Sequence, residues 1–112
     1  MSYIRSFSSL TLQDVAIVGG KNAALGEMIN NLQKANIRIP GGFAVTVEGY
    51  WRVVQENTLA ARIDTLLNGI KWDDTRSIQA AGKELRALFH NARLPQELAD
   101  EITAAYKNLS KE

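Results

Sequence analysis

Residues Val18 to Met28 read VGGKNAALGEM, so that two glycines lead into a lysine and then into an amphipathic run. Glycines allow the backbone to come close to an anion, and the start of a helix offers free N–H groups and the positive end of the helix dipole. The lysine adds a full positive charge. We therefore predict that Gly19, Gly20 and Lys21 form a phosphate-binding loop at the start of a helix.

The same residues also suit an ordinary turn that carries a solvated lysine. A P-loop has a glycine five residues before its second glycine, where Val15 stands here, and Ser or Thr after the lysine, where Asn22 stands. The glycine spacing of the dinucleotide-binding fingerprint is missing as well. From the residues alone, a phosphate role and a turn role for Gly19 and Gly20 both stay open.

The segments on either side of the loop predict short elements and one long helix. Residues 3–10 suit an extended piece, and Thr11 suits the cap of a single turn. Residues 15–18 predict a short strand or an extended lead-in to the glycines. The helix that begins at Lys21 contains Gly26, which indicates either mere tolerance or close packing of another backbone. Its expected apolar face comprises Ala24, Leu25, Met28, Ile29 and Leu32, which leaves Asn22, Glu27, Asn30, Asn31 and Lys34 for water.

The middle of the chain predicts two short strands and a helix. Residues 37–39 alternate like a strand, Pro40-Gly41 suits a type II turn, and residues 43–45 suit a second strand. Thr46 is expected to cap a helix. The expected apolar stripe of that helix is Val47, Tyr50, Trp51 and Val54.

Three further helices are expected in the rest of the chain. Asn57-Thr58 is expected to end one helix and cap the next, whose apolar residues run from Leu59 to Ile70. A left-handed cap at Asn68-Gly69 is expected to close that helix. Asp73 or Asp74 is expected to cap a helix that extends to about Asn91, and Leu94-Pro95 to begin the last one. The inner face of the last helix is expected to comprise Leu98, Ile102, Ala105, Tyr106 and Leu109.

These elements predict a predominantly helical α+β fold with about five helices and two or three short strands, in a single unit that spans residues 1–112. So few strands do not complete a sheet, and this is the pattern of an N-terminal slice of a larger α+β domain. Most remaining candidates suit structural roles. We expect Asp73-Asp74 to cap a helix, His90 to complement a helix dipole, and Tyr50, Trp51 and Tyr106 to pack in the core. Trp72 is expected in a loop.

Composition narrows the possible functions of the chain. The 112 residues carry 13 Lys and Arg against 12 Asp and Glu, a balance that provides no broad field for nucleic acid or an anionic membrane. Without cysteine and with His90 as the single histidine, thiol catalysis and a Cys- or His-based metal site are not expected. No apolar run is long enough for a membrane span or a signal peptide, so we expect a cytoplasmic protein.

A wider set of residues resembles one family. The segment from Val18 to Met28, then Ile39-Pro40-Gly41-Gly42-Phe43-Ala44-Val45-Thr46 and Tyr50, is similar to the N-terminal part of the nucleotide-binding domain of phosphoenolpyruvate synthases. Pyruvate phosphate dikinases and rifampicin phosphotransferases share this domain. The resemblance continues over nearly all of the chain, through Asn57-Thr58-Leu59, Ile63, Asp73-Asp74, Gly82, Leu85-Arg86, Pro95, Leu98, Ile102 and Ala105-Tyr106.

The resemblance implies an ATP-grasp-like fold and a contact between Lys21 and the phosphates of ATP. It implies a full-length gluconeogenic enzyme that uses ATP and Mg²⁺ to convert pyruvate and water to phosphoenolpyruvate, AMP and phosphate through a phosphohistidine. The partners would be the rest of the nucleotide-binding domain, a phosphohistidine domain and a pyruvate-binding barrel. We expect no catalytic or metal-binding residue within the 112 residues, no tightly bound cofactor and no activity of the chain alone. The alternatives are a dikinase or rifampicin phosphotransferase relative, or a free-standing helical interaction module.

Overall fold

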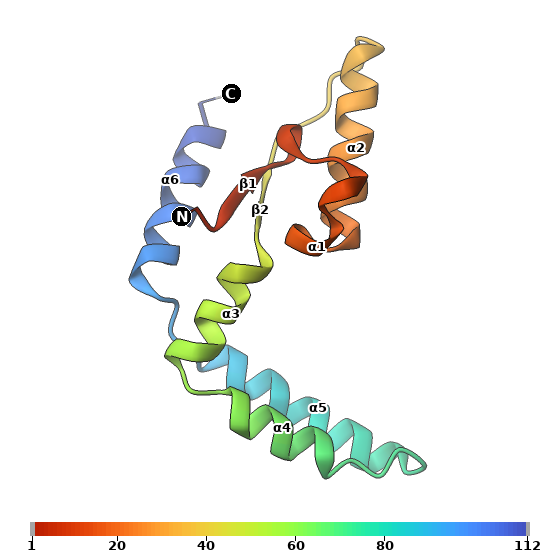
Figure 1. Cartoon of the computed structure of the whole chain (residues 1–112), viewed down its shortest axis with the longest axis vertical. Helices are drawn as coiled ribbons and strands as arrows, with labels where there is room; N and C mark the ends of the chain where they lie inside the picture. Colours follow the sequence, from red (N-terminus) through yellow and green to blue (C-terminus); the bar gives the residue numbers. More distant parts are fainter. Residues whose placement is uncertain (1, 112) are drawn as a thin grey trace. The chain divides into compact units, whose positions relative to one another are not determined.

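The computed structural model describes residues 2–111 and confirms a predominantly helical α+β chain (Figure 1). The backbone packs as two compact units: unit 1 holds the described residues up to Trp51 and from Gln96 onward, and unit 2 holds Arg52–Pro95. The elements, in chain order, are β1 (Ile4–Ser6), η1 (Phe7–Ser9), η2 (Leu12–Asp14), α1 (Val15–Val18), α2 (Gly20–Lys34), β2 (Phe43–Val45), α3 (Val47–Glu56), α4 (Ala60–Asn68), α5 (Thr75–His90) and α6 (Gln96–Leu109).

The five longer helices lie where the periodicity predicts them, but residues 15–18 form the short helix α1 and not a strand. The expected capping turn precedes α1. Thr11 accepts a hydrogen bond from the backbone of Gln13, and Asp14 accepts one from the Thr11 backbone, which makes a complete capping box. The chain therefore enters residue 15 already coiled, and it continues into a helical turn.

The sheet of unit 1 pairs β1 with β2 in an antiparallel ladder. Ile4 lies opposite Val45 and Ser6 lies opposite Phe43. The strand at residues 43–45 is thereby confirmed. The extended opening segment is confirmed only over Ile4–Ser6, because Phe7–Ser9 form the 3-10 helix η1. A small core lies beside this ladder and is formed by Leu10, Val18, Ala23 and Ala44, with Phe7 and Ile17 packed against it.

The helix α2 buries a face made of small residues, and the expected apolar face was partly wrong. Ala23, Gly26 and Ile29 are buried, whereas Ala24 and Met28 are exposed. A Cβ at Gly26 would lie 2.5 Å from Leu10 Cβ and 2.9 Å from two backbone carbonyl oxygens of η1 and the residue after it. Gly26 is therefore required by the close approach of another backbone, which decides between the two possible reasons for this glycine.

The 3-10 segment comprises residues 7–14, which include the two 3-10 helices η1 and η2. Two polar residues of α2 that were expected to face water instead form hydrogen bonds with this 3-10 segment. The Glu27 carboxylate accepts a hydrogen bond from the Leu12 N–H at 3.1 Å, and the Asn30 side chain donates one to the Leu10 carbonyl at 3.0 Å. Both bonds join residues far apart in the sequence. Helical periodicity alone therefore assigned these side chains to the wrong environment.

Residues 37–42 form neither the expected strand nor the expected turn. No helix, turn, bend or strand is formed between Ile37 and Gly42, and this irregular segment connects α2 to β2 (Figure 1). Gly19 is the glycine with positive φ among the described residues, so Gly41 lacks the backbone conformation that a type II turn requires. Because residues 37–39 have no strand partner in the described part, there is no hairpin here to close.

Thr46 caps α3 as predicted, because its hydroxyl accepts a hydrogen bond from the Gly49 N–H at 3.3 Å. The expected stripe of this helix was only partly right: Val54 is buried, but Tyr50 and Trp51 are 44% and 52% exposed. These two rings contact each other edge to face, with their centroids 5.0 Å apart. Tyr106 is 66% exposed, so the prediction that these three aromatic residues fill the core was wrong.

In unit 2, α4 and α5 pack together, and Asp74 caps α5 by accepting a hydrogen bond from the Arg76 N–H at 3.0 Å. Asn57 and Thr58 end α3 but do not cap α4, because the residue before α4 is Leu59, which makes no side-chain cap. The left-handed cap at Asn68-Gly69 was also wrong, since φ of Gly69 is −85°. The end of α4 instead uses backbone hydrogen bonds from Gly69 to carbonyls of the last turn.

The last helix, α6, begins at Gln96, one residue after the buried Pro95, as predicted. Leu98 is 1% exposed, so the inner face is anchored at its start. Within unit 1 the helix also contacts the N-terminal segment. The carboxylate of Glu101 accepts a 2.8 Å hydrogen bond from the Tyr3 N–H and another from the Ser2 hydroxyl.

Candidate functional site

The predicted loop is a junction between two helices of unit 1. Gly19 stands between α1 and α2 with φ 86° and ψ 165°, a combination that only glycine adopts readily. Its N–H donates to the Val15 carbonyl at 2.7 Å, and its carbonyl accepts from the Ala23 N–H at 3.1 Å. Gly19 thus closes one helix and opens the next without an intervening linker.

The start of α2 leaves backbone donors available. The first N–H groups of any α-helix lack intrahelical acceptors, and Gly19 has no side chain to cap them. Gly20 is exposed, and a Cβ built on it would meet nothing within 4 Å. Open backbone at a helix start, together with the positive end of a 15-residue helix dipole, is a favourable environment for an anion.

Lys21 lies in the first turn of α2, and its side chain is exposed. Within the described part of the chain its ammonium group takes part in neither of the two ion pairs, which are Arg52 with Glu56 and Arg62 with Glu84. The cation is therefore not neutralised by a carboxylate of residues 2–111. The structure thus places Gly19, Gly20 and Lys21 together at one helix start.

Asn22 has a part that sequence reasoning missed. Its side-chain amide donates a 3.0 Å hydrogen bond to the Val18 carbonyl, which is the last carbonyl of α1. This bond ties the end of α1 to the first turn of α2 across Gly19. A serine or threonine at this position, as in a P-loop, has a shorter side chain without an amide donor. Asn22 therefore stabilises the loop through the protein and not through the expected contact with water.

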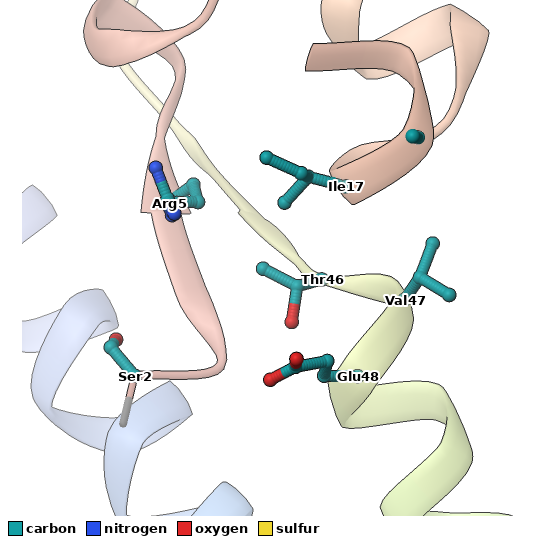
Figure 2. A pocket seen from close by; sticks show the side chains of 7 residues that line it. Ser2, Arg5, Ile17, Thr46, Val47 and Glu48 are labelled. Carbon is teal, nitrogen blue, oxygen red and sulfur yellow. The ribbon is translucent and has the colours of Figure 1, made fainter.

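A cavity of about 310 Å³ lies beside this junction within unit 1 (Figure 2). It is lined by Ser2, Arg5, Ala16, Ile17, Thr46, Val47 and Glu48. Arg5 lies on β1, Ile17 lies on α1, and Val47 and Glu48 lie at the start of α3. Ser2 comes from the segment before β1, and Thr46 lies between β2 and α3. The glycines and the lysine of the loop do not line this cavity.

The cavity combines one basic and one acidic side chain with apolar walls. Figure 2 shows Arg5 and Glu48 on different sides of it, and the buried Thr46 between β2 and α3. Sequence reasoning missed Arg5 and Glu48 because they are separated by more than forty residues in the sequence. The one available signal was the Thr46 cap, which predicts that Glu48 lies in the first turn of α3.

The other sequence candidates lie apart from the loop in the sequence and are at the surface. Asp73 and Asp74 precede α5, His90 is exposed in its last turn, and Trp72 is 69% exposed in the loop before it. Among residues 2–111, no group of three or more His, Asp or Glu side chains is placed to hold a metal ion. In the same part of the chain, no helix combines the length and apolar character needed to cross a bilayer.

The two glycines of the loop are predicted to respond differently to alanine. Gly19→Ala is expected to lower the free energy of unfolding by about 1–2 kcal/mol, because its backbone conformation is strained for any residue with a Cβ. Gly20→Ala is the matched control and is expected to be neutral or stabilising by up to about 1 kcal/mol. Urea unfolding midpoints at an unchanged slope measure both. Equal losses in the two variants would contradict the assigned backbone of Gly19.

The fold and the loop define a predominantly helical α+β module in which a Gly-Gly-Lys sequence opens a long helix. Comparison with known families makes the class specific. The chain belongs to the family described as the pyruvate phosphate dikinase AMP/ATP-binding domain, whose profile matches residues 15–112.

Curated relatives share sequence over nearly the whole chain. It is 44% identical over 106 residues to the phosphoenolpyruvate synthase of Deinococcus radiodurans, which covers 95% of this chain and 14% of the relative. It is 36% identical over 112 residues to that of Helicobacter pylori, covering 100% of this chain and 14% of the relative. It is 36% identical over 104 residues to that of Escherichia coli, covering 93% and 13%. The chain therefore spans only about one seventh of these relatives.

Proposed function

We propose that the chain is an N-terminal part of the nucleotide-binding domain of a phosphoenolpyruvate synthase. The complete enzyme would convert pyruvate, ATP and water to phosphoenolpyruvate, AMP and phosphate through a phosphohistidine. The single observation that carries this proposal is the Gly-Gly-Lys helix start in a chain that belongs to an AMP/ATP-binding family. The phosphoenolpyruvate synthase relatives do not favour a dikinase, a rifampicin phosphotransferase or a free-standing interaction module.

In this proposal the backbone N–H groups from Gly20 onward and the Lys21 ammonium group contact the ATP phosphates. Gly19, whose own N–H donates to the Val15 carbonyl, would give the loop the backbone conformation that exposes these donors. Phosphoryl transfer depends mainly on positioning and on charge neutralisation, so Lys21 needs no role as a base or nucleophile. Its exposure supports this assignment, because the side chain is free to reach a ligand. The Asn22 bond to Val18 would hold the loop in place before ATP arrives.

The remaining parts of the ATP cleft would come from the longer polypeptide. Among residues 2–111 no three metal-ligating side chains lie together, and we assign the carboxylates that would hold Mg²⁺ with the ATP phosphates to other segments of the longer polypeptide. We propose that residues 1–112 belong to one ATP-grasp-like domain and act in the cytoplasm in gluconeogenesis. A phosphohistidine domain and a pyruvate-binding barrel would complete the enzyme. The chain alone is expected to be inactive and to hold no cofactor tightly.

The proposal is tested in a chimera in which this chain replaces the matched segment of the Deinococcus radiodurans relative. Lys21→Ala is expected to weaken ATP binding by roughly 10- to 100-fold, because it removes a charge-assisted phosphate contact. The ATP concentration dependence of AMP release with pyruvate measures this effect. Lys34→Ala is the matched control, because Lys34 is an exposed lysine at the other end of the same helix.

Two outcomes would contradict the proposal in different ways. A Lys21→Ala chimera with unchanged ATP affinity and turnover would remove Lys21 from the site while leaving the family role intact. A folded chimera that neither binds ATP nor releases AMP would contradict the function itself. In the isolated chain, release of AMP above a Lys21→Ala control would contradict the expected inactivity of the 112 residues.

A further inference from the structure

The strand β2 has one edge that faces β1 and one that has no partner within the described residues. At one end of the ladder the Phe7 N–H donates to the Gly42 carbonyl at 3.0 Å, and at the other end the Thr46 N–H donates to the Tyr3 carbonyl at 2.9 Å. The backbone hydrogen-bonding groups of residues 42 and 46 therefore face β1, and by the two-residue period those of Ala44 do as well. The backbone groups of Phe43 and Val45 must then point to the opposite edge.

This open edge continues into the residues that precede β2 in the sequence. No turn or bend interrupts residues 37–42, and the backbone groups of residues 38–41 make no backbone hydrogen bond within residues 2–111. The cause lies in β1, which ends at Ser6 and coils into η1, so it cannot accompany β2 any further. Residues 38–45 thus form one long open edge, called here the outer edge.

The position of Pro40 is compatible with pairing of another strand along the outer edge. If residues 40–46 form one extended run, the backbone N–H and C=O groups of the even-numbered residues face β1. The backbone groups of the odd-numbered residues face the outer edge. The missing N–H of Pro40 is therefore on the side of β1, where β1 has already ended. The outward positions, Ile39, Gly41, Phe43 and Val45, all keep their N–H groups. Proline is tolerated at a strand edge where it interrupts no ladder bond.

A hollow lies beside residues 38–41. It has a volume of about 810 Å³ and is lined by Arg38, Ile39, Pro40, Gly41 and Leu109, the last of which is in α6 of the same unit. Large apolar side chains at both ends of this region are partly open, with Ile37 49% and Val45 37% exposed. Arg38 is the one charged residue between positions 37 and 45. An exposed edge with unpaired backbone N–H and C=O groups and few charges can pair with another strand, and natural proteins usually cover such edges.

We propose that the outer edge receives an added β-strand from the longer polypeptide to which this chain belongs. The proposal rests on the proposed function, since it needs a chain that continues. Two paired strands of three residues are too few for a stable sheet, and the chain spans only 9–14% of its relatives, so covering segments are available in them. The backbone at Ile39, Gly41, Phe43 and Val45 would supply the ladder.

Hydrogen exchange in the isolated chain and in the chimera tests the added strand. In the isolated chain the amides of Ile39, Gly41, Phe43 and Val45 are expected to exchange rapidly, whereas the Ala44 amide is already protected by β1. In the chimera the amides of Ile39, Gly41, Phe43 and Val45 are expected to exchange at least roughly 100-fold more slowly. Exchange of this segment at the same rate in both proteins would overturn the proposal.

A pair of variants separates the missing donor from a lost side chain. Ile39→Pro and Ile39→Ala both remove the isoleucine side chain, but only the proline removes the backbone N–H. The proline variant is expected to lower the urea midpoint of the chimera more than the alanine variant does, and the two should match in the isolated chain. Equal midpoints in the chimera would count against a ladder bond at residue 39.

The same experiments distinguish other occupants and a failure of the proposed function. Protection of the outer edge that rises with concentration in the isolated chain, together with a dimer in sedimentation, would assign the edge to a second copy and overturn the proposal. A chimera with Lys21-dependent turnover but an unprotected edge would overturn only the added strand. A protected edge in a chimera that does not bind ATP would support the strand and contradict the function.

Discussion

Gly26→Ala is expected to lower the free energy of unfolding by about 2 kcal/mol, although alanine is the better helix former by roughly 1 kcal/mol. The added methyl group would lie 2.5 Å from Leu10 Cβ and 2.9 Å from the carbonyl oxygens of Leu10 and Phe7. Two of these three atoms belong to the backbone and cannot rotate away. The 3-10 segment would have to move off α2, and the hydrogen bonds that Glu27 and Asn30 make to it would lengthen.

The matched control for this variant is Gly82→Ala in α5. A methyl group there would meet only the guanidinium end of Arg86, at 3.2 Å, and this flexible side chain can move aside. Gly82→Ala is therefore expected to stabilise by up to about 1 kcal/mol. Urea unfolding followed by circular dichroism measures both variants. If both glycines respond to alanine in the same direction, the close approach at Gly26 is wrong.

Asn57→Ala is expected to destabilise unit 2 by about 2–3 kcal/mol, at about 1 kcal/mol for each of three hydrogen bonds. The Asn57 amide nitrogen donates to the carbonyls of Val53 and Arg93, both at 2.8 Å, and its oxygen accepts from the Arg93 N–H at 2.9 Å. The side chain thus joins the end of α3 to the segment after α5. No other side chain in the described residues bonds both backbone groups of Arg93.

Amide hydrogen exchange across residues 52–95 measures this loss within the unit where it arises. Asn57→Asp keeps the acceptor for the Arg93 N–H but replaces the donor with an oxygen that faces two carbonyls, so it should lose at least as much as alanine. Asn68→Ala is the control, because Asn68 is exposed at the end of α4 and makes no side-chain hydrogen bond in the described part. A stable Asn57→Ala variant would show that these bonds contribute little.

The candidate site divides into a part that could be predicted and a part that could not. Gly19, Gly20 and Lys21 are consecutive in sequence, so a local motif is enough to place them together at a helix start. The positive φ of Gly19 and the open space at Gly20 show which glycine the backbone needs, a question that the residues alone left open. Arg5 and Glu48 meet at one cavity only because β1 pairs with β2, and no local pattern encodes that pairing.

The sequence by itself determined the family, the extents of the five longer helices and the caps at Thr11, Thr46 and Asp74, because periodicity and capping depend on residues within a few positions of one another. Only the tertiary structure decided which side of α2 is buried, why Gly26 lacks a side chain and why residues 37–42 form no strand. Each of these depends on a partner far away in the chain: η1 covers α2, and β1 ends before it can pair with residues 37–41. Packing between distant segments sets such features, and neither propensity nor hydrophobic period contains that information.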